Sequence, residues 1–193
     1  GIEIANLYIT NGNDPRSEQV QRKRRLQVIE RAQNYFLLAG GRSIELWFDF
    51  EPENPIVDIE VVARSLSLLA LEISNETNGH TSFRKYGHIP ELRYLSHNGQ
   101  EYDDAKWRLT QCFDVPNLSS TRVNEVVEGK IRKLKDYQYC DVYWLLLVVD
   151  FCDPAQDQNI EWPDNEIINS TPFERILIYK PQFSQVTEVP QRA

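Results

Sequence analysis

The fold of this chain is decided by TRVNEVVEGKIRKLKDY at residues 121–137, which is followed by VYWLLLVVDF at residues 142–151. The first segment carries apolar residues at the 3.6-residue spacing of a helix. The second is an almost continuous apolar run of strand length that ends at Asp150, and such runs are typical of strands in the middle of a sheet. Together the two segments predict a helix packed against a central buried strand.

The remaining segments extend this pattern in both directions. Helix starts are indicated at Asp14-Pro15 and Asn54-Pro55, and a helix end is indicated at Gly40-Gly41. The spacing of apolar residues predicts helices over residues 15–38 and 55–73, and strands over residues 43–50, 92–95, 106–114, 142–151, 176–179 and 185–189. This order predicts the α/β (α+β) class, with a mixed β-sheet flanked by helices in a single domain over residues 1–193.

Two connections carry turn signals. Residues 74–90 are polar and contain glycine, so we expect a loop there. Asn98-Gly99 is a strong hairpin signal, and it predicts that the strands on either side of it pair with each other.

Composition limits the function classes. The net charge of −8 and the pI near 5.0 disfavour nucleic acid as a partner, although they leave room for a locally basic groove. No apolar run has the length of a membrane span, and no signal-peptide pattern opens the chain. The three cysteines are widely spaced, which is typical of free thiols. These features predict a cytoplasmic protein that does not enter a membrane.

Lys130 is the first candidate for a catalytic residue. It falls in the middle of the apolar stripe formed by Val123, Val127, Leu134 and Tyr137. A lysine in this position has to extend its ammonium group to water, pair with a carboxylate, or face a cleft, because an unpaired buried charge costs several kcal/mol. A structural ion pair is the simpler interpretation, and a cationic site residue is the alternative.

A second candidate is the triplet Asp104-Ala105-Lys106, at the start of the predicted strand 106–114. Residues two apart on a strand share a face, so Asp104 could hold Mg²⁺ while Lys106 orients a phosphodiester. Asp49 or Glu45, on the predicted strand 43–50, would supply another carboxylate. The triplet is short, however, and a structural role is the more economical interpretation.

Asp150 is the third candidate metal ligand. It ends the most buried predicted strand, where α/β proteins tend to place ligands, and an acidic loop follows it. Oxygen ligands from such a loop suit Mg²⁺ or Ca²⁺, but the spacing is not that of an EF-hand. A solvated loop is the simpler interpretation.

Two segments resemble a family of uncharacterised bacterial proteins to which no activity is assigned. One has the pattern K-x-x-K-L-x-x-Y followed by W-L-L, here at Lys130, Lys133, Leu134, Tyr137, Trp144, Leu145 and Leu146. The other has the pattern S-x-P-F-[DE]-R-[IV], here at residues 170–176. The resemblance implies a bacterial protein of unknown function.

The element order also resembles the restriction-endonuclease-like fold. Nucleases of that fold carry an acidic residue on one core strand and an acid-x-Lys triplet on the next. Here the only such triplet near the predicted strand is Asp104-Ala105-Lys106, at its edge. The resemblance therefore implies a non-catalytic or degenerate nuclease-like module that acts through a protein partner.

Two alternatives remain at this stage. One is a Mg²⁺-dependent nuclease that uses Asp104, Lys106 and Lys130 with a carboxylate from Asp49 or Glu45. The other is a small-ligand-binding domain in which Trp47, Tyr94 and Trp107 form the walls of a pocket. The sequence does not decide the substrate, the partner or the oligomeric state.

Overall fold

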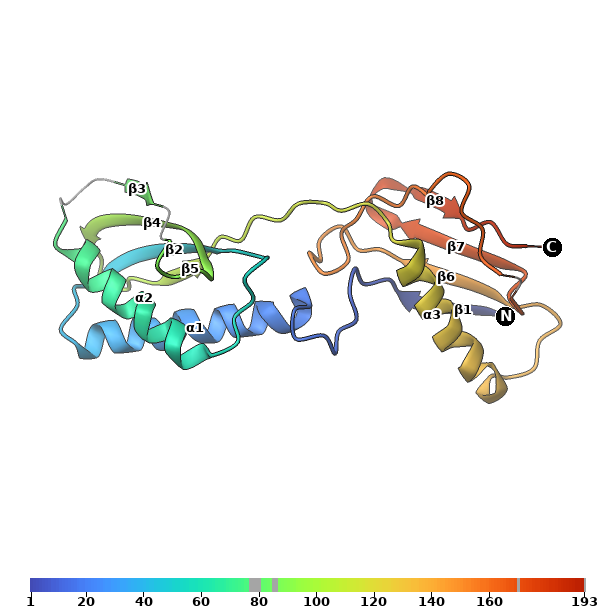
Figure 1. Cartoon of the computed structure of the whole chain (residues 1–193), viewed down its shortest axis with the longest axis horizontal. Coiled ribbons are helices and arrows are strands. Elements are labelled where there is room, and N and C mark those ends of the chain that lie inside the picture. Colours follow the sequence, from blue (N-terminus) through green and yellow to red (C-terminus); the bar gives the residue numbers. More distant parts are fainter. Residues whose placement is uncertain (77–80, 85–86, 170, 193) are drawn as a thin grey trace. The chain divides into compact units, whose positions relative to one another are not determined.

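The computed structural model describes residues 1–76, 81–84, 87–169 and 171–192, which form two compact units. Unit 1 comprises Gly1–Gly12 and Phe113–Ala193, and unit 2 comprises Asn13–Cys112. Each unit has its own mixed sheet and its own apolar core, so the α+β class is confirmed (Figure 1). The single domain over the whole chain stays a prediction, as does the restriction-endonuclease-like arrangement.

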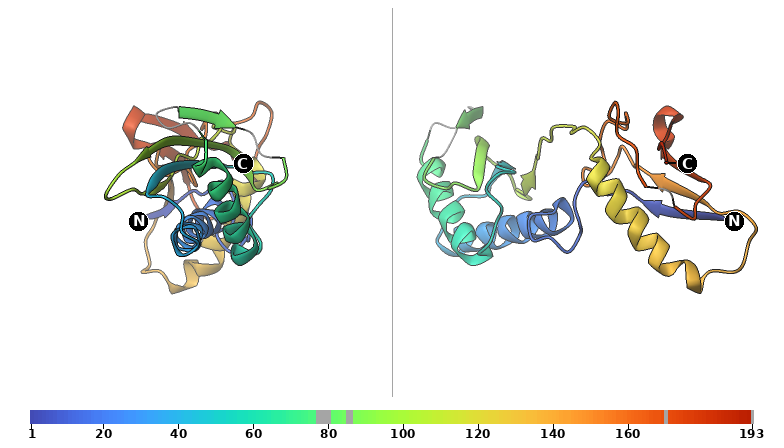
Figure 2. Two further views of the ribbon diagram at one scale, coloured as in Figure 1. Left: turned by 90° about the vertical axis from the view of Figure 1, so that its left-hand side faces the viewer. Right: turned by 45° about the vertical axis from the view of Figure 1, so that its right-hand side comes forward.

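Unit 2 consists of two helices and a four-stranded sheet with the strand order β3-β4-β2-β5. Its elements are α1 (Glu18–Leu38), β2 (Ile44–Phe50), α2 (Ile59–Ser74), β3 (Thr81–Arg84), β4 (Leu92–Glu101) and β5 (Trp107–Leu109). β4 is antiparallel to β2 and β3, whereas β5 is parallel to β2. The two helices lie side by side against one face of this sheet (Figure 2).

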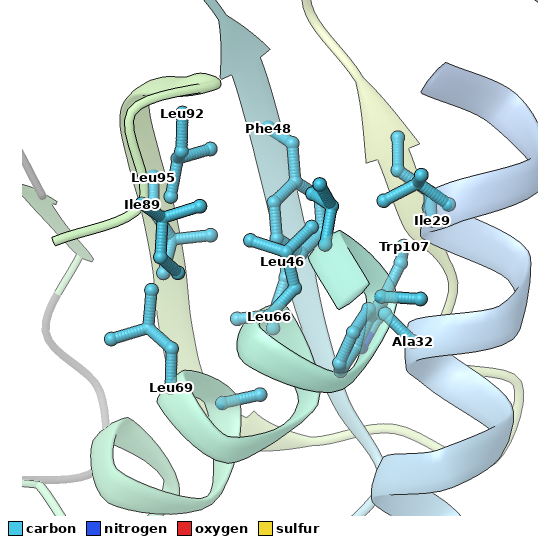
Figure 3. Packing of buried hydrophobic residues seen from close by; sticks show 14 of the residues in the cluster. Ile29, Ala32, Leu46, Phe48, Leu66, Leu69, Ile89, Leu92, Leu95 and Trp107 are labelled. Carbon is cyan, nitrogen blue, oxygen red and sulfur yellow. The ribbon is translucent and has the colours of Figure 1, made fainter. Parts of the chain in front are cut away.

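The alternation predicted for residues 43–50 decides which face of the unit 2 sheet is covered. Leu46 and Phe48 on β2 are fully buried and point towards the helices, where they meet Leu66 of α2 and Ala32 of α1 (Figure 3). Because successive residues of a strand point to opposite faces, Trp47 and Asp49 lie on the face away from the helices. Neither α1 nor α2 covers that second face.

Helix boundaries follow local capping. Ser119 caps the helix Ser120–Lys133 by accepting a hydrogen bond from the Arg122 backbone N–H at 3.3 Å. Asp58 caps α2 in the same way, so this helix begins four residues later than Pro55 indicated. Gly40 has φ of +83°, which confirms the predicted glycine end of α1.

The predicted hairpin at Asn98-Gly99 is wrong. β4 runs through both residues, and Asn98 pairs with Glu45 of β2. The strand that follows, β5, pairs with β2 and not with β4. Ladder hydrogen bonds to β2 outweigh the local turn preference here. The predicted loop over residues 74–90 also needs correction, because Thr81–Arg84 pair with β4; residues 77–80 and 85–86 lie outside the described residues.

Unit 1 contains a sheet of order β1-β6-β7-β8 and the helix α3. Its elements are β1 (Ile2–Asn6), α3 (Ser120–Lys133), the short 3-10 helix η1 (Leu134–Asp136), β6 (Trp144–Val148), β7 (Arg175–Lys180), the 3-10 helix η2 (Pro181–Phe183) and β8 (Gln185–Glu188). β1, β6 and β7 are parallel, and β8 is antiparallel to β7.

β6 is the central strand that the apolar run predicted. Leu145 and Leu147 are fully buried and belong to one core with Val123 and Val127 of α3. The alternate residues Trp144, Leu146 and Val148 are only partly buried, because they point to the other face of the sheet. Among the described residues, no helix is both long and apolar enough to cross a membrane.

Candidate functional site

The open face of the unit 2 sheet carries a hollow of about 660 Å³. All of its lining residues come from β2, β4 and the segment that follows β5. They are Trp47, Asp49, Arg93, Tyr94, Ser96, Asn98, Thr110 and Cys112. The hollow therefore belongs to unit 2 alone.

Strand register explains why these residues meet. Trp47 lies opposite Ser96, and Asp49 lies opposite Tyr94, so all four side chains are on the same face of the sheet. Trp47 is partly buried and Tyr94 is 43% exposed. Two aromatic side chains on neighbouring strands thus border the hollow, with the buried Ser96 on β4 opposite Trp47.

An ion pair forms one end of the hollow. Arg93 donates two hydrogen bonds to the Asp49 carboxylate, at 2.8 and 3.0 Å, and a third to the Cys112 carbonyl at 3.1 Å. The Cys112 backbone N–H donates to Asp49 at 3.2 Å. Burial alone would lower the pKa of Arg93, but the hydrogen bonds and charge of Asp49 outweigh it and raise that pKa above its usual value. Asp49, predicted as a metal ligand, is thus bound to a permanent cation.

A second ion pair lies beside Trp47. Arg108 of β5 donates to Glu45 of β2 at 2.9 Å, and its guanidinium lies over the Trp47 ring, 5.9 Å from the centroid. This contact restrains the indole, since a cation over an aromatic face is attracted by the ring electrons. The charges on this side of the hollow are therefore also paired.

Trp107 does not line the hollow, so the prediction that it forms a pocket wall is wrong. Its side chain is 7% exposed and lies in the core, with its ring centroid 5.2 Å from that of Phe36 and 5.3 Å from that of Phe48. Leu46 pairs with Trp107, which places Trp107 on the helix-covered face. Trp107 therefore lies on the face of the sheet opposite to the one that carries Trp47.

Asp104 and Lys106 lie away from Asp49. Both are exposed in the turn between β4 and β5, and Tyr102 of this turn donates its backbone N–H to the Ser43 carbonyl at 2.8 Å. Ser43 precedes Asp49 by six residues, about 20 Å along an extended strand. The structure therefore places Asp49 and Asp104 at opposite ends of β2.

Lys130 forms the ion pair that its apolar surroundings suggested. Its ammonium donates to the Glu3 carboxylate of β1 at 2.5 Å, within unit 1. Burial alone would raise the pKa of Glu3, but the hydrogen bond and charge of Lys130, together with the Tyr137 hydroxyl and Lys133, hold it below its usual value. The pKa of Tyr137 is raised by burial and by the neighbouring Glu3.

Asp150 lies at the other end of the unit 1 sheet. Its carboxylate accepts hydrogen bonds from the Cys152 backbone N–H at 2.8 Å and from Gln182 at 2.7 Å. Glu3 pairs with Leu145, five residues before Asp150, so about 16 Å of extended chain separates Asp150 from the position of the Glu3–Lys130 pair. Within the described ranges, no cluster of three histidine, cysteine, aspartate or glutamate side chains could hold a metal ion.

Only some of the residues that line the hollow could be predicted from the sequence. Trp47 and Tyr94 were among the residues predicted to form the walls of a pocket. Arg93, Ser96 and Cys112 carry no local signal, because long-range pairing brings them to the site. β4 pairs with β2 on one side, and β5, which leads to Cys112, pairs with β2 on the other. Comparison of the chain with protein-family models, with curated proteins and with solved structures found no match.

Proposed function

We propose that unit 2 is a binding module that takes up a small organic molecule in the hollow on its open sheet face. The observation that carries this proposal is the hollow itself, whose volume of about 660 Å³ falls in the usual range of small-molecule sites. Trp47 and Tyr94 supply apolar contact area, and Ser96 supplies a polar group that can fix the orientation of the ligand.

The charged side chains of the hollow are already paired with each other, which favours ligand binding over catalysis as its function. A general base or metal ligand needs lone pairs that the substrate or metal can reach. The Asp49 carboxylate already accepts hydrogen bonds from Arg93 and from the Cys112 backbone. This carboxylate therefore supports the wall of the hollow.

Saturation-transfer NMR with a panel of uncharged aromatic fragments tests this function on the full chain. We expect fragments that bind the wild type to lose their signal with Trp47→Ala. Trp144→Ala, which removes the same side chain from unit 1, is the matched control and should leave the signals unchanged. An equal loss in both variants, or binding that survives Trp47→Ala, would contradict the proposal.

One prediction from the sequence is a nuclease-like module that acts through a protein partner, in a bacterial, cytoplasmic protein. The other is a nuclease that uses Asp104, Lys106, Lys130 and Mg²⁺. Both stay predictions. Calorimetric titration of Mg²⁺ and Mn²⁺ tests the metal-dependent version. Saturable binding that Asp104→Ala abolishes would support it, whereas the absence of binding heat would reject it.

A further inference from the structure

We infer that the ligand of the hollow carries an uncharged planar ring, which inserts between Trp47 and Tyr94 with its polar edge towards Ser96. This inference rests on the proposed function and adds the chemical class of the ligand. Three features of the hollow carry it: the spacing of its two aromatic residues, the orientation of Trp47, and the pairing of its charges.

The spacing of the two aromatic side chains suits one inserted ring. Trp47 lies opposite Ser96, and Tyr94 is two residues from Ser96 on the same strand, so Trp47 and Tyr94 are diagonal neighbours on one face. Such neighbours are about 7–8 Å apart. A planar ring stacked between two others needs about 3.5–4 Å on each side, which adds to the same separation. Within the described residues, the two side chains make no ring contact with each other that would close this space.

Trp47 is oriented for this contact by its neighbour on the opposite side. Arg108 comes from β5 and Tyr94 from β4, and these strands flank β2 on its two sides. The Arg108 guanidinium lies over one face of the Trp47 ring. Trp47 also lines the hollow, which Tyr94 borders on the β4 side, so the inserted ring would stack on the indole face turned away from Arg108. An indole restrained before binding loses less conformational freedom when the ligand arrives.

Charge pairing indicates that the inserted ring is neutral. Asp49 is paired with Arg93, and Glu45 with Arg108, so each of these four charges already has a partner. A charged ligand would lose its hydration in the hollow without a counter-ion to replace it, which is costly. An uncharged ring with a hydroxyl or amide edge avoids this cost.

Ser96 is the polar group best placed to meet that edge. The residue is 8% exposed and lines the hollow, and its hydroxyl bonds to no other group within the part of the chain that the structure describes. A hydroxyl can both donate and accept, so it recognises either a carbonyl or an O–H on the ligand. Thr110, by contrast, already donates its hydroxyl to the Phe48 carbonyl at 3.4 Å.

Three probes that share a naphthalene ring test the charge of the ligand on the full chain at pH 7. They are 2-naphthol, which is neutral, 2-naphthalenesulfonate, which is an anion, and 2-naphthylmethylammonium, which is a cation. We expect 2-naphthol to bind about tenfold or more tightly than either ion, as measured by NMR chemical-shift titration. An ion that binds as tightly as 2-naphthol would overturn the inference.

Substitutions locate the ring between the two aromatic residues. Tyr94→Ala should weaken 2-naphthol binding roughly five- to tenfold, and Tyr94→Phe should retain it, because the stacking surface is kept. Tyr139→Ala, which removes an exposed tyrosine of unit 1, is the control and should change nothing. Ser96→Ala should reduce the preference for 2-naphthol over unsubstituted naphthalene. If Tyr94→Ala bound 2-naphthol as tightly as the wild type, the insertion of the ring between Trp47 and Tyr94 would be rejected.

The experiments distinguish an error in the proposed binding function from an error in the proposed ligand class. If none of the three probes binds, or if binding is indifferent to Trp47→Ala, the binding function itself is wrong. If binding depends on Trp47 but shows no charge preference or no dependence on Tyr94, only the chemical class is wrong. Circular dichroism of each variant shows whether the fold is kept.

Discussion

Lys130 on α3 donates a hydrogen bond of 2.5 Å to Glu3 on β1, although the two residues are 127 positions apart in the chain. The pair joins the helix of unit 1 to the first strand of its sheet, and both side chains are mostly shielded, with 20% and 25% of their surface exposed. It explains why a lysine is tolerated in the middle of an apolar stripe. We therefore expect the stability of unit 1 to fall in acid, where Glu3 is protonated.

We expect Glu3→Gln to lower the free energy of unfolding by about 1.5 kcal/mol at pH 7, the usual contribution of a hydrogen bond to a charged group. The pKa of Glu3 is lower in the folded protein than in the unfolded chain, so its stabilisation is present above the unfolded value near 4.5 and is lost as the pH falls through the folded value. The difference between wild type and variant should therefore shrink by pH 3. Urea denaturation at both pH values measures it.

Glu128→Gln is the control for this pH dependence. Glu128 is 70% exposed on the same helix, and its carboxylate is 4.0 Å from Arg132. Such an exposed pair contributes little, so the variant should follow the wild type at both pH values. A Glu3→Gln effect of equal size at pH 7 and pH 3 would show that the ion pair is not its source.

Gly41→Ala should destabilise unit 2 by about 2 kcal/mol. A Cβ atom at this position would lie 2.5 Å from the Phe36 ring, which is fully buried and in contact with Trp107. The ring cannot withdraw without displacing its neighbours, and overpacking of this kind typically costs 1–3 kcal/mol. Thermal unfolding followed by circular dichroism measures the change.

Gly129→Ala is the same substitution at a position where we expect it to raise stability. Gly129 lies inside α3, and a Cβ there would come no closer than 3.9 Å to its nearest neighbour, on Arg132. Alanine should stabilise the helix by about 0.5–1 kcal/mol, because glycine loses more backbone freedom on folding. Destabilisation by both substitutions would argue against the close contact with Phe36 as the cause.

Asp49→Asn should destabilise unit 2 by about 2 kcal/mol, since it leaves the Arg93 guanidinium without its anion in a partly buried position. Removing both charges with Asp49→Asn/Arg93→Gln should restore part of this loss, and a double-mutant cycle in urea measures the coupling. Glu45→Gln, which breaks the more exposed pair with Arg108, should cost less than about 1 kcal/mol. Additive effects of the first two substitutions would contradict the coupling.

Asp157→Ala should lower the free energy of unfolding more than Lys180→Met. Lys180 is 6% exposed, and its ammonium donates to Asp157 at 2.5 Å and to the Gln158 carbonyl at 3.0 Å, beneath the rings of Phe151 and Phe183. Loss of the carboxylate leaves a buried cation and should cost about 3 kcal/mol, whereas methionine removes the charge but keeps the packed stem.

Asp164→Ala in the same acidic segment is the control for this comparison. Asp164 is exposed, so its removal should change stability by less than about 0.5 kcal/mol. The free energy of unfolding of all three variants is measured by urea denaturation. Equal stability of the Asp157 and Lys180 variants would contradict a buried ammonium that depends on Asp157.

Local chemistry made much of the secondary structure predictable. The helix end at Gly40 depends only on a few neighbouring residues, and it was expected from the sequence. The central strand β6 followed from its apolar run. The Asn98-Gly99 hairpin failed because turn preference is weak compared with the ladder that β4 forms with β2 along most of its length.

The sequence by itself determined most of the helices and strands and the alternation that separates Leu46 and Phe48 from Trp47 and Asp49, because these depend on the period of side chains along one segment. Only the tertiary structure decided that Asp49 meets Arg93, that Glu3 meets Lys130 and that Trp107 lies on the core face. These relationships depend on which strands pair and in which register, and register is set by packing across the whole unit. The hollow is therefore a product of strand pairing, which no single segment encodes.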